Sequence, residues 1–359
     1  MSRRKRAFIV GYYGMSNFGD DLFREVISAQ AGRLLPEYEV RPTTWLRPSV
    51  NRRYASPTFF GSVLRLIAGV VAAVRSDVIV LGGGSVLWGL TGVRAVQWKL
   101  SRLTRTRFQA LGVSIGPFPT NDDRVAVSRF LRGLDRLVVR DQASISLGKE
   151  MGLGSTLRMG GDLAALYPQT ITLQSYRDPR VRLIGLALCN FPGFDVESEE
   201  NMINAFASSL RATSTPGIED RVCVISLNNH SHYGDDALSR RAVEKLSAKG
   251  VPALLVRYVD MGVRETWSLI SSLDGLVAVR LHAAISAYLS SVPFALLEYH
   301  EKCAAFCDDV GQHESVRIRV NSSRKDYEES IRNLFLRRYG PTVPADAYIQ
   351  RARLTYLSK

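Results

Sequence analysis

Short apolar segments alternate with helix-like segments along the chain, and this alternation limits the classes of fold that the chain can adopt. In the first half, strands are expected at Ala7–Val10, Val78–Leu81, Phe108–Ile115 and Arg136–Val139, and helices at Asp21–Leu35 and Gln142–Lys149. In the second half, strands are expected at Leu183–Leu188, Arg221–Leu227, Ala253–Arg257, Gly275–Val279 and Phe294–Leu297. Strands that are joined through helices form parallel sheets. The pattern predicts an α/β protein with two doubly wound, Rossmann-like domains that face a central cleft.

The polar, proline-marked stretch Tyr167–Arg180 separates the two series of strands and suggests the domain boundary. We expect an N-terminal domain at 1–170, a C-terminal domain at 181–323, and a C-terminal helix and tail at 324–359 that packs back on the first domain. In the second domain, Asp235 or Asp236 is expected to cap a helix that runs to Ala248.

Charge and cysteine content limit the classes of partner. The 359 residues include 47 Lys and Arg against 34 Asp and Glu, a net charge of +13. This excess favours phosphorylated small molecules, polyanions or anionic membrane surfaces. Nucleic acid is disfavoured because the basic residues are scattered and no recognition motif accompanies them. Cys189 and Cys223 lie in apolar runs typical of buried free thiols, so a reducing cytoplasm is expected.

The basic N-terminus, Ser2–Arg6, is followed by too few apolar residues for a signal peptide or a membrane span. It is interpreted either as a solvated tail or as a peripheral contact with anionic lipid at the inner face of the cell membrane. The longest apolar stretch, Leu64–Val74, is also too short to cross a bilayer.

The strongest candidate for a functional site is Arg280-Leu281-His282, where an apolar strand gives way to a helix. The first N–H groups of a helix and its positive dipole end bind anions, and a guanidinium grips phosphate or carboxylate bidentately. The unperturbed pKa of histidine lies near neutrality, so His282 is able to carry a proton there. Arg140 follows the strand Arg136–Val139 in the same way, and it is interpreted either as a second anion ligand or as the ion-pair partner of a nearby carboxylate.

Two glycine-rich loops also follow strands, at Gly11–Asp21 and Gly82–Ser85. Neither matches the G-x-G-x-x-G or P-loop fingerprint, and acidic residues after the first loop would repel a phosphate. The first loop is interpreted as turn chemistry or as a sugar-hydroxyl site that uses Asn17 and Asp20.

A polar loop, Asn228–Asp236, contains His230 and His232 beside two aspartates. The spacing is not that of a known zinc motif, so a metal site is the less favoured alternative and no metal is expected. Contact with a substrate through Asn228 and His230, or simple loop polarity, is favoured instead.

An ordered set of motifs from about residue 8 to about residue 310 resembles the polysaccharide pyruvyl transferase family. The motifs are Asn17-Phe18-Gly19-Asp20-Asp21, Gly82-Gly83-Gly84-Ser85, Leu111 to Pro117, Val139-Arg140-Asp141, Gly160 to Ala164, Arg280-Leu281-His282, and Pro293 through Glu298 to Lys302. Each motif is weak alone, and their order makes the resemblance specific.

The resemblance implies a GT-B-like two-domain enzyme that transfers the enolpyruvyl group of phosphoenolpyruvate to a sugar as a ketal, with release of phosphate. Arg280, Leu281 and His282 fall on the signature for phosphoenolpyruvate. His282 is then the expected general acid, and Glu298 or Asp20 the expected base.

Under the same resemblance Arg140 is a further donor ligand, and Asn17, Asn228 and His230 are candidate acceptor contacts. Phosphoenolpyruvate is a co-substrate, so no cofactor or metal is expected. The acceptor is expected to be a saccharide or a lipid-linked saccharide.

Two other functions are compatible with the sequence. One is a GT-B-like glycosyltransferase that uses a sugar nucleotide, and the other is a non-catalytic subunit of envelope polysaccharide assembly. Fold alone does not separate these functions.

Overall fold

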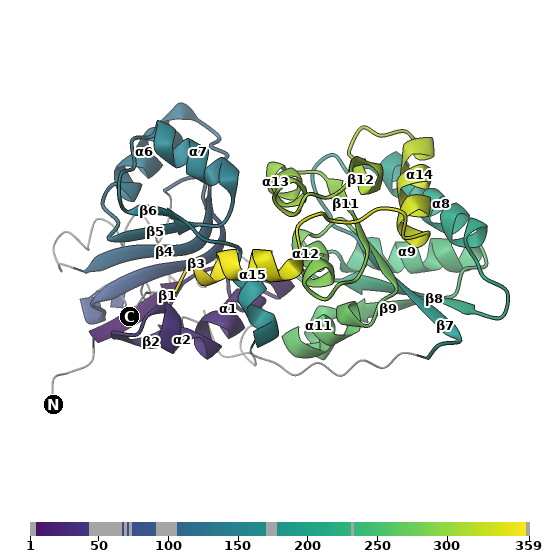
Figure 1. The fold of residues 1–359 in the computed structure, drawn as a ribbon, viewed down its shortest axis with the longest axis horizontal. Helices are drawn as coiled ribbons and strands as arrows, with labels where there is room; N and C mark the ends of the chain where they lie inside the picture. Colours follow the sequence, from purple (N-terminus) through teal and green to yellow (C-terminus); the bar gives the residue numbers. More distant parts are fainter. Residues whose placement is uncertain are drawn as a thin grey trace. The chain divides into compact units, whose positions relative to one another are not determined.

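The computed structural model describes residues 5–42, 67, 70–71, 74–90, 106–169, 178–230 and 233–356. The chain divides into two compact units. Unit 1 contains Met1–Met15, Asp20–Thr170 and Asp346–Lys359, and unit 2 contains Ser16–Gly19 and Ile171–Ala345. Each unit has one sheet with helices packed along it (Figure 1). No helix in the described ranges is long and apolar enough to cross a membrane.

Unit 1 is built on a six-stranded sheet in the order β2-β1-β3-β4-β5-β6, and every neighbouring pair is parallel. Its strands are β1 (Lys5–Val10), β2 (Tyr38–Pro42), β3 (Val78–Leu87), β4 (Arg107–Ile115), β5 (Arg136–Val139) and β6 (Leu157–Met159). Its helices are α1 (Phe18–Ala29), α2 (Ala31–Leu34), α6 (Asn121–Leu131), α7 (Gln142–Glu150), the 3-10 helix η1 (Leu163–Gln169) and α15 (Ala345–Arg353). The first two residues of α1 and the first residue of α15 are assigned to unit 2.

Unit 2 carries a second six-stranded parallel sheet, in the order β12-β11-β10-β7-β8-β9. Its strands are β7 (Val181–Ala187), β8 (Glu219–Ser226), β9 (Ala253–Arg257), β10 (Gly275–Ala278), β11 (Phe294–Glu298) and β12 (Arg317–Arg319). Its helices are α8 (Val196–Ala212), α9 (Asp236–Ala248), α10 (Tyr258–Met261), α11 (Val263–Ser271), α12 (Leu281–Leu289), α13 (Glu301–Val310), the 3-10 helix η2 (Glu314–Val316) and α14 (Arg324–Phe335).

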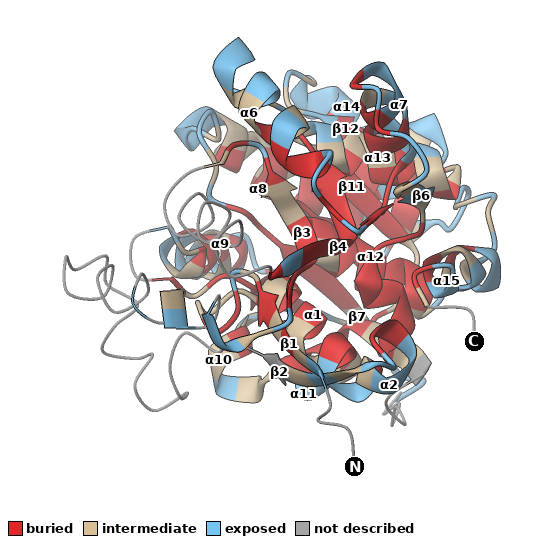
Figure 2. Ribbon diagram, turned by 90° about the vertical axis from the view of Figure 1, so that its left-hand side faces the viewer, coloured by how far each residue is buried: buried red, intermediate tan, exposed pale blue. Residues whose placement is uncertain are grey.

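Strand order confirms that each unit is doubly wound. Both sheets run outward in two directions from their first strands, and the central strands are buried on both faces (Figure 2). All nine strands expected from the sequence are present. The sequence missed β2, β6 and β12, each of which is an edge strand. Edge strands are short or carry polar residues, as in Leu157-Arg158-Met159, so their apolar signal is weak.

The C-terminal segment differs from the expectation that residues 324–359 act as one piece against the first domain. Helix α14 belongs to unit 2 and packs against α8, because its apolar face, with Tyr327, Ile331 and Leu334, joins the core there. Only Asp346–Lys359 belong to unit 1. The expected helix Asp21–Leu35 is likewise divided, into α1 and α2.

The C-terminal residues of unit 1 fit closely against its sheet. A Cβ on Gly161 would lie 2.9 Å from Cα of Ala352, so only glycine allows α15 to approach this far. The buried guanidinium of Arg136 donates to the backbone oxygens of Thr355 and Leu34. Burial, with the nearby charge of Arg158, lowers the pKa of Arg136 to about 10. The C-terminal segment is therefore an integral part of unit 1.

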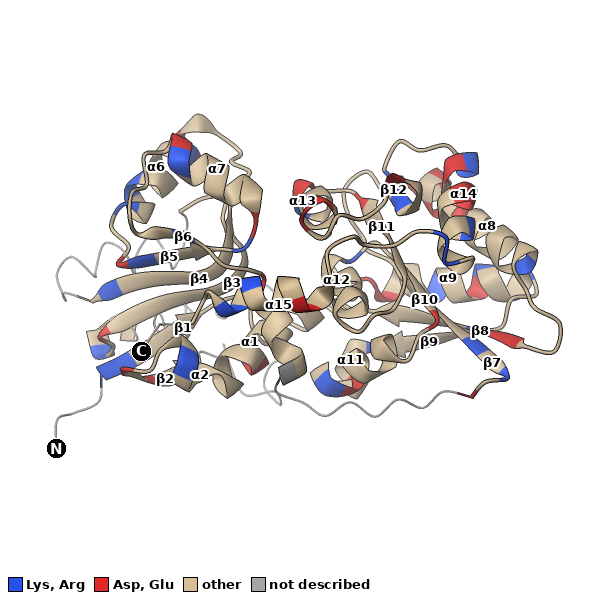
Figure 3. Cartoon of the chain, in the orientation of Figure 1, with Lys and Arg blue, Asp and Glu red and all other residues tan. Residues whose placement is uncertain are grey.

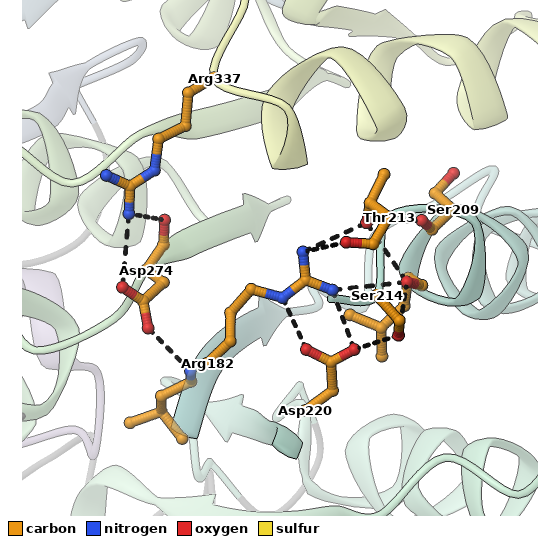
Figure 4. A network of polar contacts seen from close by, with 9 residues as sticks. Arg182, Ser209, Thr213, Ser214, Asp220, Asp274 and Arg337 are labelled. Atoms are coloured by element: carbon orange, nitrogen blue, oxygen red, sulfur yellow. Dashed lines mark hydrogen bonds and ion pairs between the residues drawn. The ribbon is translucent and has the colours of Figure 1, made fainter. Parts of the chain in front are cut away.

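The amino-terminal edge of the unit 2 sheet is held by a polar network (Figure 4). Arg182 makes a bidentate pair with Asp220, at 2.6 and 2.9 Å, and also donates to the backbone oxygen of Thr213 after α8. Asp274 accepts from the backbone N–H of Leu183 at 2.9 Å and from Arg337 at 3.3 Å. These contacts tie β7, β8, α8 and the start of β10 together.

The contact between Gly161 and α15 yields a stability prediction. Gly161→Ala should lower the free energy of unfolding by about 1–3 kcal/mol, because the added methyl group forces the helix away from the sheet. Gly154→Ala is the matched control, since no atom lies within 4 Å of its Cβ position. Urea titration of both variants measures the difference, and equal midpoints would show that α15 does not pack there.

Candidate functional site

The carboxyl edge of the unit 2 sheet gathers polar residues from several loops. Asn190 follows β7, Asn228 follows β8, Arg280 follows β10 and Tyr299 follows β11. In a parallel sheet all these strand ends lie on one side, where ligands bind in open α/β sheets. Three of the four positions are connected by hydrogen bonds through one aspartate, Asp235.

Asp235 organises this edge. Its carboxylate is fully buried and accepts from Nε of Arg280 at 2.7 Å and from Nη2 of Arg280 at 2.6 Å. It also accepts from the backbone N–H groups of Asn190 at 3.0 Å and Asn228 at 3.2 Å. The sequence predicted a helix cap here, and Asp235 does occupy the N-cap position of α9, but its side chain makes no capping bond. The Asp235 carboxylate binds the guanidinium of Arg280 instead of the first N–H groups of α9.

The pair fixes both the charge and the orientation of Arg280. Burial by itself would lower the pKa of the guanidinium, but the hydrogen bonds and charge of Asp235 raise it above its ordinary value. Arg280 is the N-cap residue of α12, and the preceding N–H, that of Val279, donates to Ala187 at 2.7 Å. Asp235 binds the Nε and Nη2 groups, so the orientation of the guanidinium is fixed while Nη1 lies outside this bidentate pair.

Leu281 and His282 form the first turn of α12. Leu281 is buried and anchors the turn in the core. His282 is partly exposed, and its ring lies against Gly19: a Cβ on Gly19 would be 2.0 Å from Nδ1. The backbone oxygen of His282 accepts from the Ser286 hydroxyl at 2.7 Å, within the same helix. The ring therefore occupies the space that any other residue at position 19 would fill.

The structure brings Asn17, Asn228 and His230 together in unit 2. Asn17 and Asn228 form an isolated antiparallel bridge. The Asn228 side chain accepts from the N–H of His230 at 3.2 Å and donates to the oxygen of Tyr233 at 3.0 Å. His230 stacks on Tyr233 with ring centroids 5.2 Å apart. These side chains hold the loop in shape, and their contact with an acceptor stays a prediction.

The metal alternative for this loop depends partly on His232, which lies outside the described residues. Among the residues that the structure describes, no group of three or more His, Cys, Asp and Glu side chains is placed to hold a metal ion.

The two candidate bases lie in different surroundings. Glu298, at the end of β11, forms a close ion pair with Arg317 of β12, and Arg317 also binds Asp308 at 2.7 Å. The pair neutralises the Glu298 carboxylate and ties β11 to β12. Asp20 is on α1 of unit 1, and its Oδ1 lies 3.8 Å from the Cβ position of Gly84.

Tyr299, which the sequence analysis did not single out, follows Glu298 directly. Its ring stacks on Phe191 with centroids 4.5 Å apart, and Lys302 Nζ lies 5.6 Å from its centroid. Burial, followed by the charges of neighbouring thiols, raises the pKa of Tyr299, so its hydroxyl stays protonated. All four cysteines are free and buried, as expected for Cys189 and Cys223.

In unit 1, Arg140 adopts the ion-pair alternative that the sequence left open. It is 5% exposed and donates to Asp162 at 3.0 Å, to the Ser114 hydroxyl at 2.7 Å and to the Ser85 hydroxyl at 3.0 Å. Asp141 caps α7 by accepting from the N–H of Ser144 at 2.8 Å. Arg140 thus joins β3, β4 and the loop after β6.

The glycine-rich loops of unit 1 are held by specific contacts. Gly83 and Gly84 have φ of +77° and +84°, which favours glycine, and a side chain on Gly83 would meet the ring of Phe23. Tyr13 donates its hydroxyl proton to the oxygen of Gly82. Asp21 accepts from the N–H of Gly14 at 2.5 Å, which is the turn chemistry weighed for the first loop.

A cavity of about 410 Å³ lies at the opposite, amino-terminal edge of the unit 2 sheet, with Ile184, Ile218 and Phe335 in its lining. Its three arginines, Arg182, Arg221 and Arg337, are each paired with a carboxylate. Lys and Arg in the described ranges lie on many elements, interspersed with acids (Figure 3). Neither feature marks a second anion site comparable to Arg280.

A family model described as polysaccharide pyruvyl transferase matches residues 17–301 of the chain. No curated protein sequence matches the chain significantly.

Solved structures show the same fold. Staphylococcus aureus MnaA, in a structure with UDP, has a TM-score of 0.59 and 12% identity, over 92% of this chain and 88% of that one. UDP-GlcNAc 2-epimerase from Neisseria meningitidis, bound to UDP-GlcNAc, has a TM-score of 0.56 and 11% identity, over 97% and 93%. The Methanocaldococcus jannaschii enzyme, in complex with UDP-GlcNAc and UDP, has a TM-score of 0.56 and 11% identity, over 98% and 99%. The fold is therefore the two-domain, GT-B-like α/β fold.

Removal of the Asp235 charge tests how the edge is organised. Asp235→Asn should lower the free energy of unfolding by about 3–5 kcal/mol, because the buried Arg280 cation loses its counter-charge. Glu219→Gln is the matched control: Glu219 makes the same bidentate contact with Arg221, but both side chains are more than half exposed. Chemical denaturation should leave the control near the parent midpoint. An equal loss of unfolding free energy in Asp235→Asn and Glu219→Gln would contradict the role of Asp235 as the counter-charge of Arg280.

Proposed function

We propose, from the premise that this chain belongs to the polysaccharide pyruvyl transferase family, that it transfers the enolpyruvyl group of phosphoenolpyruvate to a sugar. The product is a pyruvate ketal on a polysaccharide or glycolipid precursor, and phosphate is released. The family membership establishes polysaccharide pyruvylation in general terms. The donor, the ketal chemistry and the roles of individual residues form the proposal.

One observation carries it: a permanently charged arginine is held by a buried carboxylate at the start of a helix, two residues before a histidine. Phosphoenolpyruvate carries its phosphate and its carboxylate on the same carbon, so its binding site needs fixed positive charge beside a proton donor. Arg280 supplies the charge with little reorganisation, since Asp235 already holds its guanidinium. The N–H groups in the first turn of α12 add a positive partial charge.

The proposed reaction can be written with every bond and proton accounted for, with His282 as the acid. His282 gives a proton to the methylene carbon of phosphoenolpyruvate, and that carbon becomes a methyl group. The oxygen of one sugar hydroxyl bonds to the neighbouring carbon, and a base takes its proton. The C–O bond to phosphate breaks, phosphate leaves with the electron pair, and a second sugar hydroxyl closes the ketal with loss of its proton.

The remaining residues are assigned by their surroundings. Leu281 fixes the turn that presents Arg280 and His282. Glu298 or Asp20 is the proposed base, and the Glu298 carboxylate is paired with Arg317. The guanidinium of Arg140 is bound by Asp162 and two serines within unit 1, so the expected direct contact of Arg140 with the donor is not part of the proposal.

The acceptor is proposed to be a saccharide or lipid-linked saccharide that contacts Asn17, Asn228 and His230. Transient contact of the basic chain with anionic lipid would bring it to a membrane-bound acceptor. Two of the structural neighbours were solved with UDP-GlcNAc bound. A sugar nucleotide is therefore the alternative donor to phosphoenolpyruvate.

The test is phosphate release from phosphoenolpyruvate with a panel of lipid-linked and simple glycosides. Arg280→Lys should reduce acceptor-dependent release by about 10²-fold or more, because a lysine cannot keep both the Asp235 pair and a ligand contact. His282→Gln should reduce it by about 10²–10⁴-fold through loss of the proton donor. Arg221→Lys, at an exposed pair in the same unit, should leave the rate unchanged.

Calorimetry with phosphoenolpyruvate separates the possible failures. Binding without turnover in the parent protein means that the panel lacks the acceptor. Binding of UDP-sugars together with no binding of phosphoenolpyruvate would instead select a glycosyltransferase.

A further inference from the structure

Residues 16–19 belong to unit 2 although the residues on both sides of them in the chain belong to unit 1. This Ser16–Gly19 segment pairs with the loop after β8. The N–H of Phe18 donates to the oxygen of Leu227 at 2.9 Å, and the N–H of Asn229 donates to the oxygen of Ser16 at 2.8 Å. The segment is thus fixed to the same loop that delivers Asp235 to Arg280.

Two further contacts hold the segment rigid. The Phe18 side chain is fully buried and packs edge-on against Tyr258, with ring centroids 5.7 Å apart. The Asn17 side chain accepts from the N–H of Gly19 at 3.1 Å and closes a local turn. Gly19 is therefore held from both sides, by its own turn and by the pairing of Phe18.

The ring of His282 lies where a side chain of residue 19 would be. A Cβ on Gly19 would stand 2.0 Å from Nδ1, 2.6 Å from Cε1 and 2.6 Å from Cγ of His282. Gly19 does not have a positive φ, so its backbone conformation does not require glycine. Close approach of the imidazole is what excludes a larger residue.

We propose that the Ser16–Gly19 segment is a positioning element for His282, and that Gly19 and Asn17 are its decisive residues. The backbone at Gly19, in the first turn of α1, lies against the imidazole and sets the direction in which the ring presents its proton. Asn17 acts through the turn that fixes Gly19, so its part is to hold this backbone in place. The inference rests on the proposed function for its effect on catalysis, but the contact itself does not.

Gly19→Ala is the direct test, with ring resonances of histidine measured by NMR and assigned through His282→Gln. The added methyl group should shift the His282 resonances and lower kcat for acceptor-dependent phosphate release by about 10²-fold, as a displacement near 1 Å does. The KM for phosphoenolpyruvate should stay nearly constant, because Arg280 is untouched. Gly32→Ala, with no atom within 4 Å of its Cβ position, is the control.

Asn17 provides a second variant that adds no atoms. Asn17→Ala removes the acceptor for the N–H of Gly19 and should move the His282 resonances, whereas Asn17→Asp keeps that oxygen and should restore them. Unchanged His282 resonances in both Gly19→Ala and Asn17→Ala, with thermal midpoints near that of the parent, would overturn the proposal. Shifted resonances in variants of a parent protein that neither binds phosphoenolpyruvate nor releases phosphate would support the positioning role and reject the proposed reaction instead.

Discussion

The buried Asp235 carboxylate is the interaction on which the functional edge of unit 2 depends. It joins the loops after β7, β8 and β10, since it binds two backbone N–H groups and the guanidinium of Arg280. A buried ion pair adds little net stability, because desolvation of both groups offsets their attraction. Its value here is geometric: one carboxylate with several donors leaves Arg280 a single orientation. A fixed cation does not need to reorganise when an anion arrives.

Both units contain an arginine–aspartate pair near the carboxyl end of a strand, but the two pairs have different roles. In each, an arginine lies within two residues of the end of a strand inside the sheet and binds an aspartate from another loop, Arg140 with Asp162 and Arg280 with Asp235. Arg140 also binds two serine hydroxyls and is 5% exposed, so it serves the internal structure of unit 1. Arg280 contacts Asp235 through one side only. The arrangement in unit 1 is a structural joint, whereas the one in unit 2 keeps a side available to a ligand.

The sequence predicted the central strands and the residues at their carboxyl ends, because both depend on local patterns. A buried parallel strand is a continuous apolar run, as in Val78-Ile79-Val80-Leu81, and the residue after it reaches the functional edge. Pairings between distant residues leave no such pattern. Nothing local distinguishes the Asp235 that binds Arg280 from a helix cap, or the Gly19 beside His282 from an ordinary turn glycine. Edge strands such as β12 were missed because packing, and not their own sequence, makes them strands.

The path of the chain has a consequence for its biosynthesis. Unit 1 takes residues from both ends of the chain, and the chain passes between the units at 15/16, 19/20, 170/171 and 345/346. A ribosome makes all of unit 2 before it makes the last residues of unit 1. Until those residues emerge, Gly160 and Gly161 present an open surface where α15 will lie. Unit 1 therefore stays incomplete until translation reaches its last segment. Neither unit corresponds to a continuous stretch of the gene.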